Sequence, residues 1–175
     1  MPKGMVPIYT RDIGGANQVA FSNIPQTYTD LKIVVSARAA SATDTAQGIY
    51  FQFNGDGSAN YSGVTLRNAS NVLNAYRSNG SNAFLEFDIT NSANGTGHYS
   101  AVELYIPNYA GNVFKQAIGS SVKEDNATAG GYTYNILRAN LLKTNSPITI
   151  VTIGTNITAP NFAGGSTVTI YGISK

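Results

Sequence analysis

The sequence contains no cysteine, no tryptophan and a single histidine, His98. Without cysteine, the chain cannot form a disulfide, a thiolate metal site or a cysteine nucleophile. A serine–histidine–aspartate triad would have to use His98, and no Gly-x-Ser-x-Gly motif accompanies this residue. We interpret His98 as a solvated loop residue. The sequence therefore predicts a protein that is not an enzyme, with no catalytic residue and no cofactor.

Charge is also scarce, because only 11% of the residues are charged and the net charge is +2. The eleven basic residues are scattered along the chain, whereas nucleic-acid binding needs them clustered. No apolar run approaches the 18 residues of a membrane-spanning helix. The N-terminal stretch lacks the apolar segment of a signal peptide. We expect synthesis in a cytoplasm and no binding to nucleic acid or membranes.

Neutral polar residues take the place of charge, with 19 asparagines, 17 threonines and 15 serines beside 18 glycines. A surface of such groups suits close, hydrated packing against neighbouring proteins. Hydrophobic residues still make up 42% of the chain, so it can bury a core and is not a disordered tract. A length of 175 residues is typical of one domain.

Apolar and polar residues alternate in several short stretches, which is the period of a half-buried β-strand. The clearest example is 49–53, which the tight polar turn 54–58 follows. Segment 132–142 fits either a strand or a helix, and its Tyr-Thr-Tyr motif favours the strand. Further strands are expected at 17–24, 31–38, 64–66, 72–76, 85–89, 102–106, 114–122, 148–153 and 167–173.

About ten short strands with turn signals every 8–12 residues indicate an all-β fold. We predict an antiparallel β-sandwich, jelly-roll-like, with little helix. Residues 16–175 are expected to form this single domain.

Residues 1–15 are predicted to be an N-terminal extended arm, because prolines and glycines make this stretch a poor core strand. Its apolar side chains suggest an interaction with a neighbouring subunit, although a frayed terminus is the alternative. The candidate interaction residues are Met5, Val6, Ile8 and Tyr9.

Two acidic features are candidate functional sites. Glu86 and Asp88 lie two residues apart, a spacing that a glycosidase could use, but the alternation predicts that both point into solvent. The turn at 54–58 has one carboxylate, Asp56, and no bidentate glutamate for calcium. We therefore interpret it as a hairpin turn and predict no metal site.

Four segments together resemble structural proteins of tailed-bacteriophage virions: NIPQTYTDLKIVVSAR (23–38), FNGDGSANYS (53–62), YIPNYA (105–110) and NFAGGSTVTIYGI (161–173). The group includes capsid cement or decoration proteins and tail-associated β-sandwich proteins, especially those of cyanobacterial and marine phages. The resemblance implies a β-sandwich that oligomerises, binds a virion surface and carries no catalytic residues.

On this basis we expect a capsid decoration protein that binds the major capsid protein on the outside of the assembled lattice. Lattice symmetry favours a homo-oligomer, a trimer above all. The expected location is the virion capsid surface, after synthesis in the host cytoplasm. The alternative is a tail or fibre module that binds host surface glycans, and a tail-borne glycan hydrolase is a third hypothesis.

Overall fold

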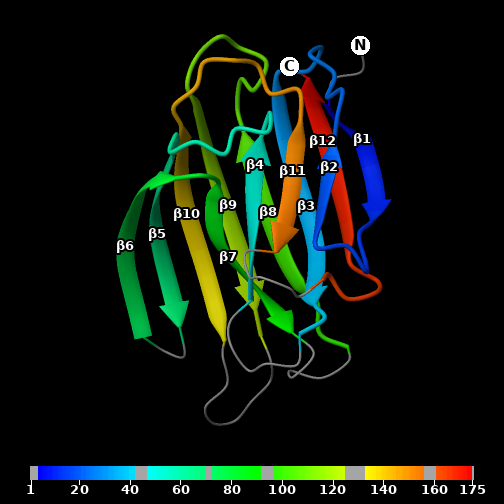
Figure 1. The fold of residues 1–175 in the computed structure, drawn as a ribbon, viewed down its shortest axis with the longest axis vertical. Coiled ribbons are helices and arrows are strands. Elements are labelled where there is room, and N and C mark those ends of the chain that lie inside the picture. Colours follow the sequence, from blue (N-terminus) through cyan, green and yellow to red (C-terminus); the bar gives the residue numbers. More distant parts are fainter. Residues whose placement is uncertain are drawn as a thin grey trace.

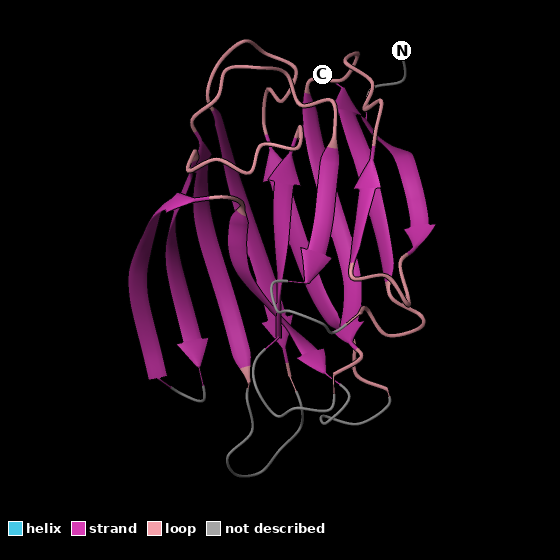
Figure 2. Ribbon diagram, in the orientation of Figure 1, coloured by secondary structure: helices cyan, strands magenta, loops and turns pink. Residues whose placement is uncertain are grey.

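The computed structural model describes residues 4–41, 47–69, 72–91, 97–124, 133–155 and 161–174. These residues form twelve strands and no helix (Figure 2). The strands are β1 (Gly4–Asp12), β2 (Gln18–Phe21), β3 (Asp30–Ala39), β4 (Gln47–Phe53), β5 (Tyr61–Ala69), β6 (Val72–Ser81), β7 (Phe84–Asn91), β8 (Ser100–Ile106), β9 (Lys115–Lys123), β10 (Tyr134–Leu142), β11 (Val151–Thr155) and β12 (Thr167–Ser174).

The strands lie in two layers, which confirms the predicted all-β sandwich. The large layer has the order β1-β12-β3-β8-β9-β10-β5-β6, and the small layer has the order β2-β11-β4-β7. Within the described residues every strand pairing is antiparallel except that of β3 with β7, where Arg38 lies beside Thr90 and Ala39 beside Asn91. This short parallel contact joins the two layers.

Aromatic and aliphatic side chains from both layers fill the space between them. The rings of Phe51 and Phe87 meet edge to face with centroids 5.2 Å apart, and those of Phe53 and Phe84 meet at 5.5 Å. Alternate residues of β3, such as Ile33, are completely buried opposite them. Full burial of each such side chain contributes about 1.5–3 kcal/mol, so the period-2 pattern specifies which side faces the core.

The small layer covers only part of the large one. Figure 1 shows β2, β11 and β4 in front of the middle of the large sheet, while β5 and β6 extend beyond them at the left. Strand β7 is the outermost strand of the small layer on that side. The two edge strands of the large sheet are β1 and β6.

Two sequence expectations can be compared directly with the strands. The preference for a strand at 132–142 is confirmed by β10, although residue 132 lies outside the described residues. The hairpin expected at 54–58 is wrong, because β4 pairs with β7 and β11 whereas β5 pairs with β6 and β10. The turn therefore carries the chain from the small layer to the large one.

We expect Gly119→Ala to lower the free energy of unfolding by about 1–3 kcal/mol, the usual cost of overpacking a core. A Cβ at Gly119 would lie 2.5 Å from the Phe87 ring and 3.0 Å from Leu104. Gly57→Ala is the control, because a Cβ there meets only Gln52 at 3.7 Å. Urea denaturation of both variants provides the measurement, and equal midpoints would contradict the packing described for β9.

Candidate docking surface

Strand β9 turns its large apolar residues away from the interior of the sandwich. Ala117, Gly119 and Ser121 face inward and are buried. Ile118 and Val122 alternate with them, face outward and are 53% and 47% exposed. The usual polarity of a sheet that covers a core is therefore reversed on this strand.

The neighbouring strands β5 and β10 continue the same pattern. Val64, Leu66 and Leu137 are between 44% and 53% exposed. Leu66 pairs with Leu137 in the register, and Ala139 lies between Val64 and Ile118. Paired residues point to the same side of a sheet, so these side chains form one continuous patch. We call this patch the outer apolar face; its members are Val64, Leu66, Ile118, Val122 and Leu137.

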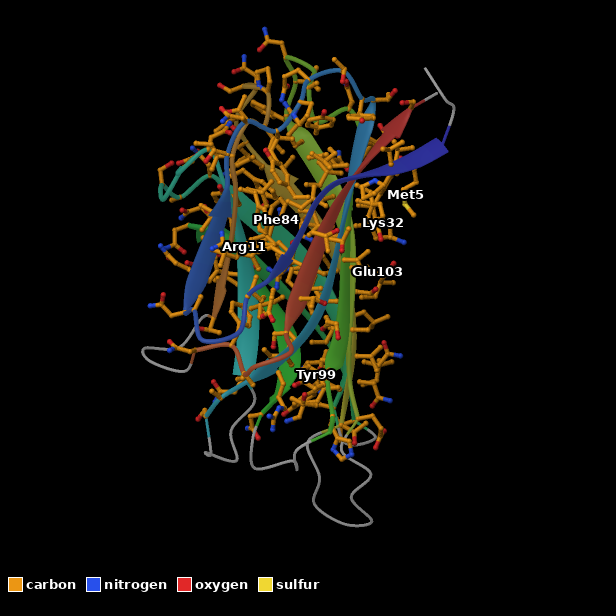
Figure 3. The ribbon with its side chains drawn as sticks, turned by 90° about the vertical axis from the view of Figure 1, so that its right-hand side faces the viewer. Met5, Arg11, Lys32, Phe84, Tyr99 and Glu103 are labelled. Carbon is orange, nitrogen blue, oxygen red and sulfur yellow. The ribbon has the colours of Figure 1, made fainter. Side chains whose placement is uncertain are left out.

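Charged side chains flank the outer apolar face on both sides. Lys32 and Glu103 form an ion pair with 2.9 Å between Nζ and Oε2, and Figure 3 shows them on the side of the large sheet away from the small one. On the opposite flank, Arg77 of β6 pairs with Val64 and is exposed. A hollow of about 280 Å³ separates the patch from the ion pair; its lining is Lys32, Glu103, Tyr105, Ile118, Gly119, Ser120 and Leu137.

The inner side of the same strands contacts a group of charged residues, in which Arg138 and Asp88 are buried and Arg67 and Glu86 are about one-third exposed. Arg138 of β10 is 1% exposed, and its Nη1 forms an ion pair with Glu86. The Nε of Arg138 donates a hydrogen bond to Oδ1 of Asn140 at 2.8 Å, and Nη2 donates one to the hydroxyl of Ser78. We call this group the buried ion cluster; its members are Arg67, Glu86, Asp88 and Arg138.

Strand β7 supplies both carboxylates of the buried ion cluster. Glu86 has a φ of 68°, and the β4–β7 register shifts between Ile49 and Phe51, so β7 contains a bulge here. Asp88 is 7% exposed, with its Oδ2 3.8 Å from Nη1 of Arg67. The prediction that Glu86 and Asp88 point into solvent is therefore wrong, because the bulge breaks the alternation and β7 lies over cationic strands.

Two tyrosine rings cover the cations of this region. The guanidinium of Arg67 lies 5.7 Å from the centroid of Tyr76 and 5.2 Å from that of Tyr134. The ammonium of Lys123 lies 5.6 Å from the Tyr134 centroid. Cation–π contacts of this kind partly replace the lost hydration of a buried charge. The inner side of β9, β10 and β5 thus contains charges and rings beside buried aliphatic residues such as Ile136 and Leu142.

Reversed polarity indicates what the outer apolar face can do. Large contiguous apolar patches are uncommon on soluble monomers and mark sites of interaction. Each of its aliphatic side chains would contribute up to about 1.5–3 kcal/mol if a partner buried it fully. The outer apolar face is therefore suited to association with another macromolecule.

The residues expected to interact lie elsewhere, on β1. Strand β1 pairs with β12 of the same chain from Gly4 to Asp12, and Ile8 and Tyr9 pack against the core. The Tyr9 hydroxyl donates a hydrogen bond to the carbonyl of Ser22 at 2.7 Å. Of the four candidates, Met5 is the most exposed, at 52%, and Val6 is half-buried (Figure 3). Attachment through 1–15 stays a prediction, and residues 1–3 lie outside the described ones.

The weaker candidates of the sequence also have definite places. His98 is an exposed loop residue whose carbonyl accepts a hydrogen bond from the Thr90 hydroxyl at 2.8 Å. Asp56 accepts hydrogen bonds from the Ser58 amide and from Nδ2 of Asn60, each at 3.0 Å. The described residues contain no group of three or more acidic or histidine side chains that could hold a metal ion.

Sequence reasoning missed the outer apolar face for a specific reason. Alternation on β9 reveals two sides but does not say which one faces the core. The signal that was present is the small size of Ala117, Gly119 and Ser121, since such residues leave room for large side chains from an opposing layer.

Comparisons with known proteins add no assignment to this surface. A scan against protein-family models gave no match, and a search of curated proteins gave none either. Within the described ranges, no helix has the length and hydropathy needed to cross a membrane.

Asp88 should make the free energy of unfolding depend on pH. Burial raises the pKa of Asp88 to about 6 from 3.8, although the charges of Arg67 and Lys123 act against this shift. Between about pH 4 and 6 the folded protein keeps a proton that the unfolded chain releases, so stability falls as the pH rises. The shift corresponds to about 3 kcal/mol.

We expect Asp88→Asn to remove this fall, so that the variant gains stability relative to the wild type from pH 4 to pH 6. Urea titrations at half-unit pH steps measure the difference. Asp56→Asn is the control of opposite sign, because hydrogen bonds from Asn60 and Ser58 lower the pKa of Asp56. Its stabilising contribution is lost as the pH falls. Parallel wild-type and Asp88→Asn curves would contradict the burial of Asp88.

Deletion of residues 2–12 tests whether β1 acts as an arm or as part of the sandwich. We expect a lower melting temperature, because β12 loses a partner strand and the Tyr9–Phe21 ring contact at 5.7 Å disappears. Thermal unfolding followed by circular dichroism is the measurement. An unchanged melting temperature would show that 1–15 behaves as the arm that the sequence predicted.

Proposed function

We propose that this protein is a structural, non-enzymatic component of a tailed-bacteriophage virion, a decoration protein on the outside of the capsid. Its partners in this role are the major capsid protein and further copies of itself. The observation that carries the proposal is the outer apolar face, because an exposed apolar surface suits a protein that functions by binding other proteins. The resemblance of segments 23–38, 53–62, 105–110 and 161–173 supports the assignment to a virion.

Three of the four resembling segments lie together in the fold. Segment 23–38 contains most of β3, which pairs with β12 in 161–173 and with the end of β8 in 105–110. Asp30 connects two of them, since it accepts hydrogen bonds from the Tyr105 hydroxyl at 2.8 Å and from the Asn108 amide at 2.9 Å. The resemblance therefore falls on one connected part of the large sheet, and this supports a likeness of fold.

The mechanism of a decoration protein is mass action. A protein that binds only the assembled lattice stabilises it by about 2.7 kcal/mol per site when its free concentration is 100 times the Kd. The charged side chains of Lys32, Glu103 and Arg77 around the outer apolar face fit such a role, since interfaces are apolar at the centre and polar at the rim.

Immunogold labelling of particles of the phage that encodes this chain tests the proposal. We expect regular labelling of the capsid, together with release of DNA at a lower temperature from particles that lack the gene. Added purified protein should restore the release temperature. Label on the tail alone would support the glycan-binding alternative, and unlabelled virions would overturn a structural role in the particle.

A further inference from the structure

We propose that the outer apolar face binds the same face of a second copy of this chain, in a dimer with two-fold symmetry. The inference deepens the proposed function, on which it rests for its biological setting, by naming the first partner of the docking surface. It follows from the dimensions of the face and from the arrangement of charges around it.

The outer apolar face lies on three strands, and together with its charged flanks on β8 and β6 it has the dimensions that a stable dimer needs. Strands β8, β9, β10, β5 and β6 are consecutive in the large sheet, and at about 4.8 Å per strand they span about 24 Å. The nine residues of β10 extend for about 30 Å at about 3.3 Å each. The resulting area of about 700 Å² approaches the roughly 800 Å² per partner of a standard interface.

The centre of this area is apolar and continuous. Leu137 lies on β10, the middle strand, with Leu66 directly beside it on β5 and Ile118 one row away on β9. Two sheets that pack face to face, about 10 Å apart and with their strands nearly aligned, bury side chains of this kind between them. Stacking β5 on the β9 of a second copy would place Val64 against Ile118 and Leu66 against Ser120, with Leu137 of the two copies facing each other.

The flanking charges select the orientation of the second copy. Arg77 on β6 and Glu103 on β8 each lie two strands away from β10, on opposite sides of it. Their rows in the register are adjacent, because Arg77 is in the row of Val64 and Glu103 is in the row of Leu137. A two-fold axis along β10 therefore brings Arg77 of each copy within reach of Glu103 of the other, where Arg77 would share this carboxylate with Lys32. An axis across the strands would place each charge near its own counterpart, which electrostatic repulsion disfavours.

Pairing through edge strand β1 is a less suitable route to a dimer. Edge strand β1 contains Pro7, and its register with β12 shifts between Pro7 and Tyr9. Proline and bulges on an edge strand oppose the addition of another strand. The face, and not this edge, is the surface where a second copy fits.

The mass of the full-length protein in solution tests the dimer directly. Sedimentation equilibrium from 1 to 200 µM should give twice the chain mass of 18.4 kDa. Leu137→Lys should weaken the dimer by about a hundredfold, because it buries a charge at the centre of the interface, and should leave the circular dichroism spectrum unchanged. Val113→Lys is the matched control, since Val113 is an exposed loop valine outside the face.

A charge swap tests the position of the axis. Arg77→Glu and Glu103→Arg should each weaken the dimer by about tenfold, and the double variant should recover most of the wild-type affinity. Recovery is the result that a general loss of stability would not produce. Failure of the double variant to recover would overturn the axis along β10.

The remaining outcomes separate this inference from the proposed function. A wild-type protein that is monomeric at 200 µM, a trimer, or a dimer unaffected by Leu137→Lys would each overturn the face-to-face dimer. A dimer of the expected behaviour in a protein that does not label virions would support the inference and overturn the proposed function. Labelled virions, together with a purified protein that is monomeric, would support the proposed function and overturn the inference.

Discussion

The mismatch in width between the two layers is the constraint on which the rest of this structure depends. A layer of four strands cannot cover a sheet of eight, so β5 and β6 extend past the small layer. On the inner side of β5 and β10 the chain places Arg67 and Arg138 beside the aliphatic Ile136, and the bulged strand β7 leans over the two arginines with two carboxylates. Burying charges is costly unless they are paired, and the ion pairs and tyrosine rings reduce that cost.

On β5, β9 and β10 the outer apolar face lies opposite an inner side that holds charged and small residues together with the aliphatic Ile136 and Leu142. The outer apolar face and the buried ion cluster are therefore the two sides of the same strands. Polar residues are usual on the solvent-facing side of an antiparallel sheet, so the outer apolar face is the feature on which the proposed association rests.

Sequence reasoning succeeded where the local pattern and the packing agree. The alternation on β3, β4 and β8 specified strands and core positions correctly, because both layers cover them. It failed at Glu86, because no neighbouring residue in the sequence predicts the positive φ of Glu86. The resulting bulge also changed the side to which Asp88 points. It also treated Pro7 as an argument against a strand, although an edge strand with a bulge accommodates proline. Which side of β9 faces the core depends on a partner layer that no local pattern encodes.

The position of β12 between β1 and β3 has a consequence for the timing of folding during synthesis. β1 is made first, but the strand that attaches it to the sheet is complete only when translation reaches Ser174. At about 5–20 residues per second, the interval from Asp12 to Thr167 is about 8–31 s. During that time β1 lacks the strand with which it pairs, and the edge of β3 that β12 covers is open. Completion of the large sheet is thus a late event in the synthesis of these twelve strands.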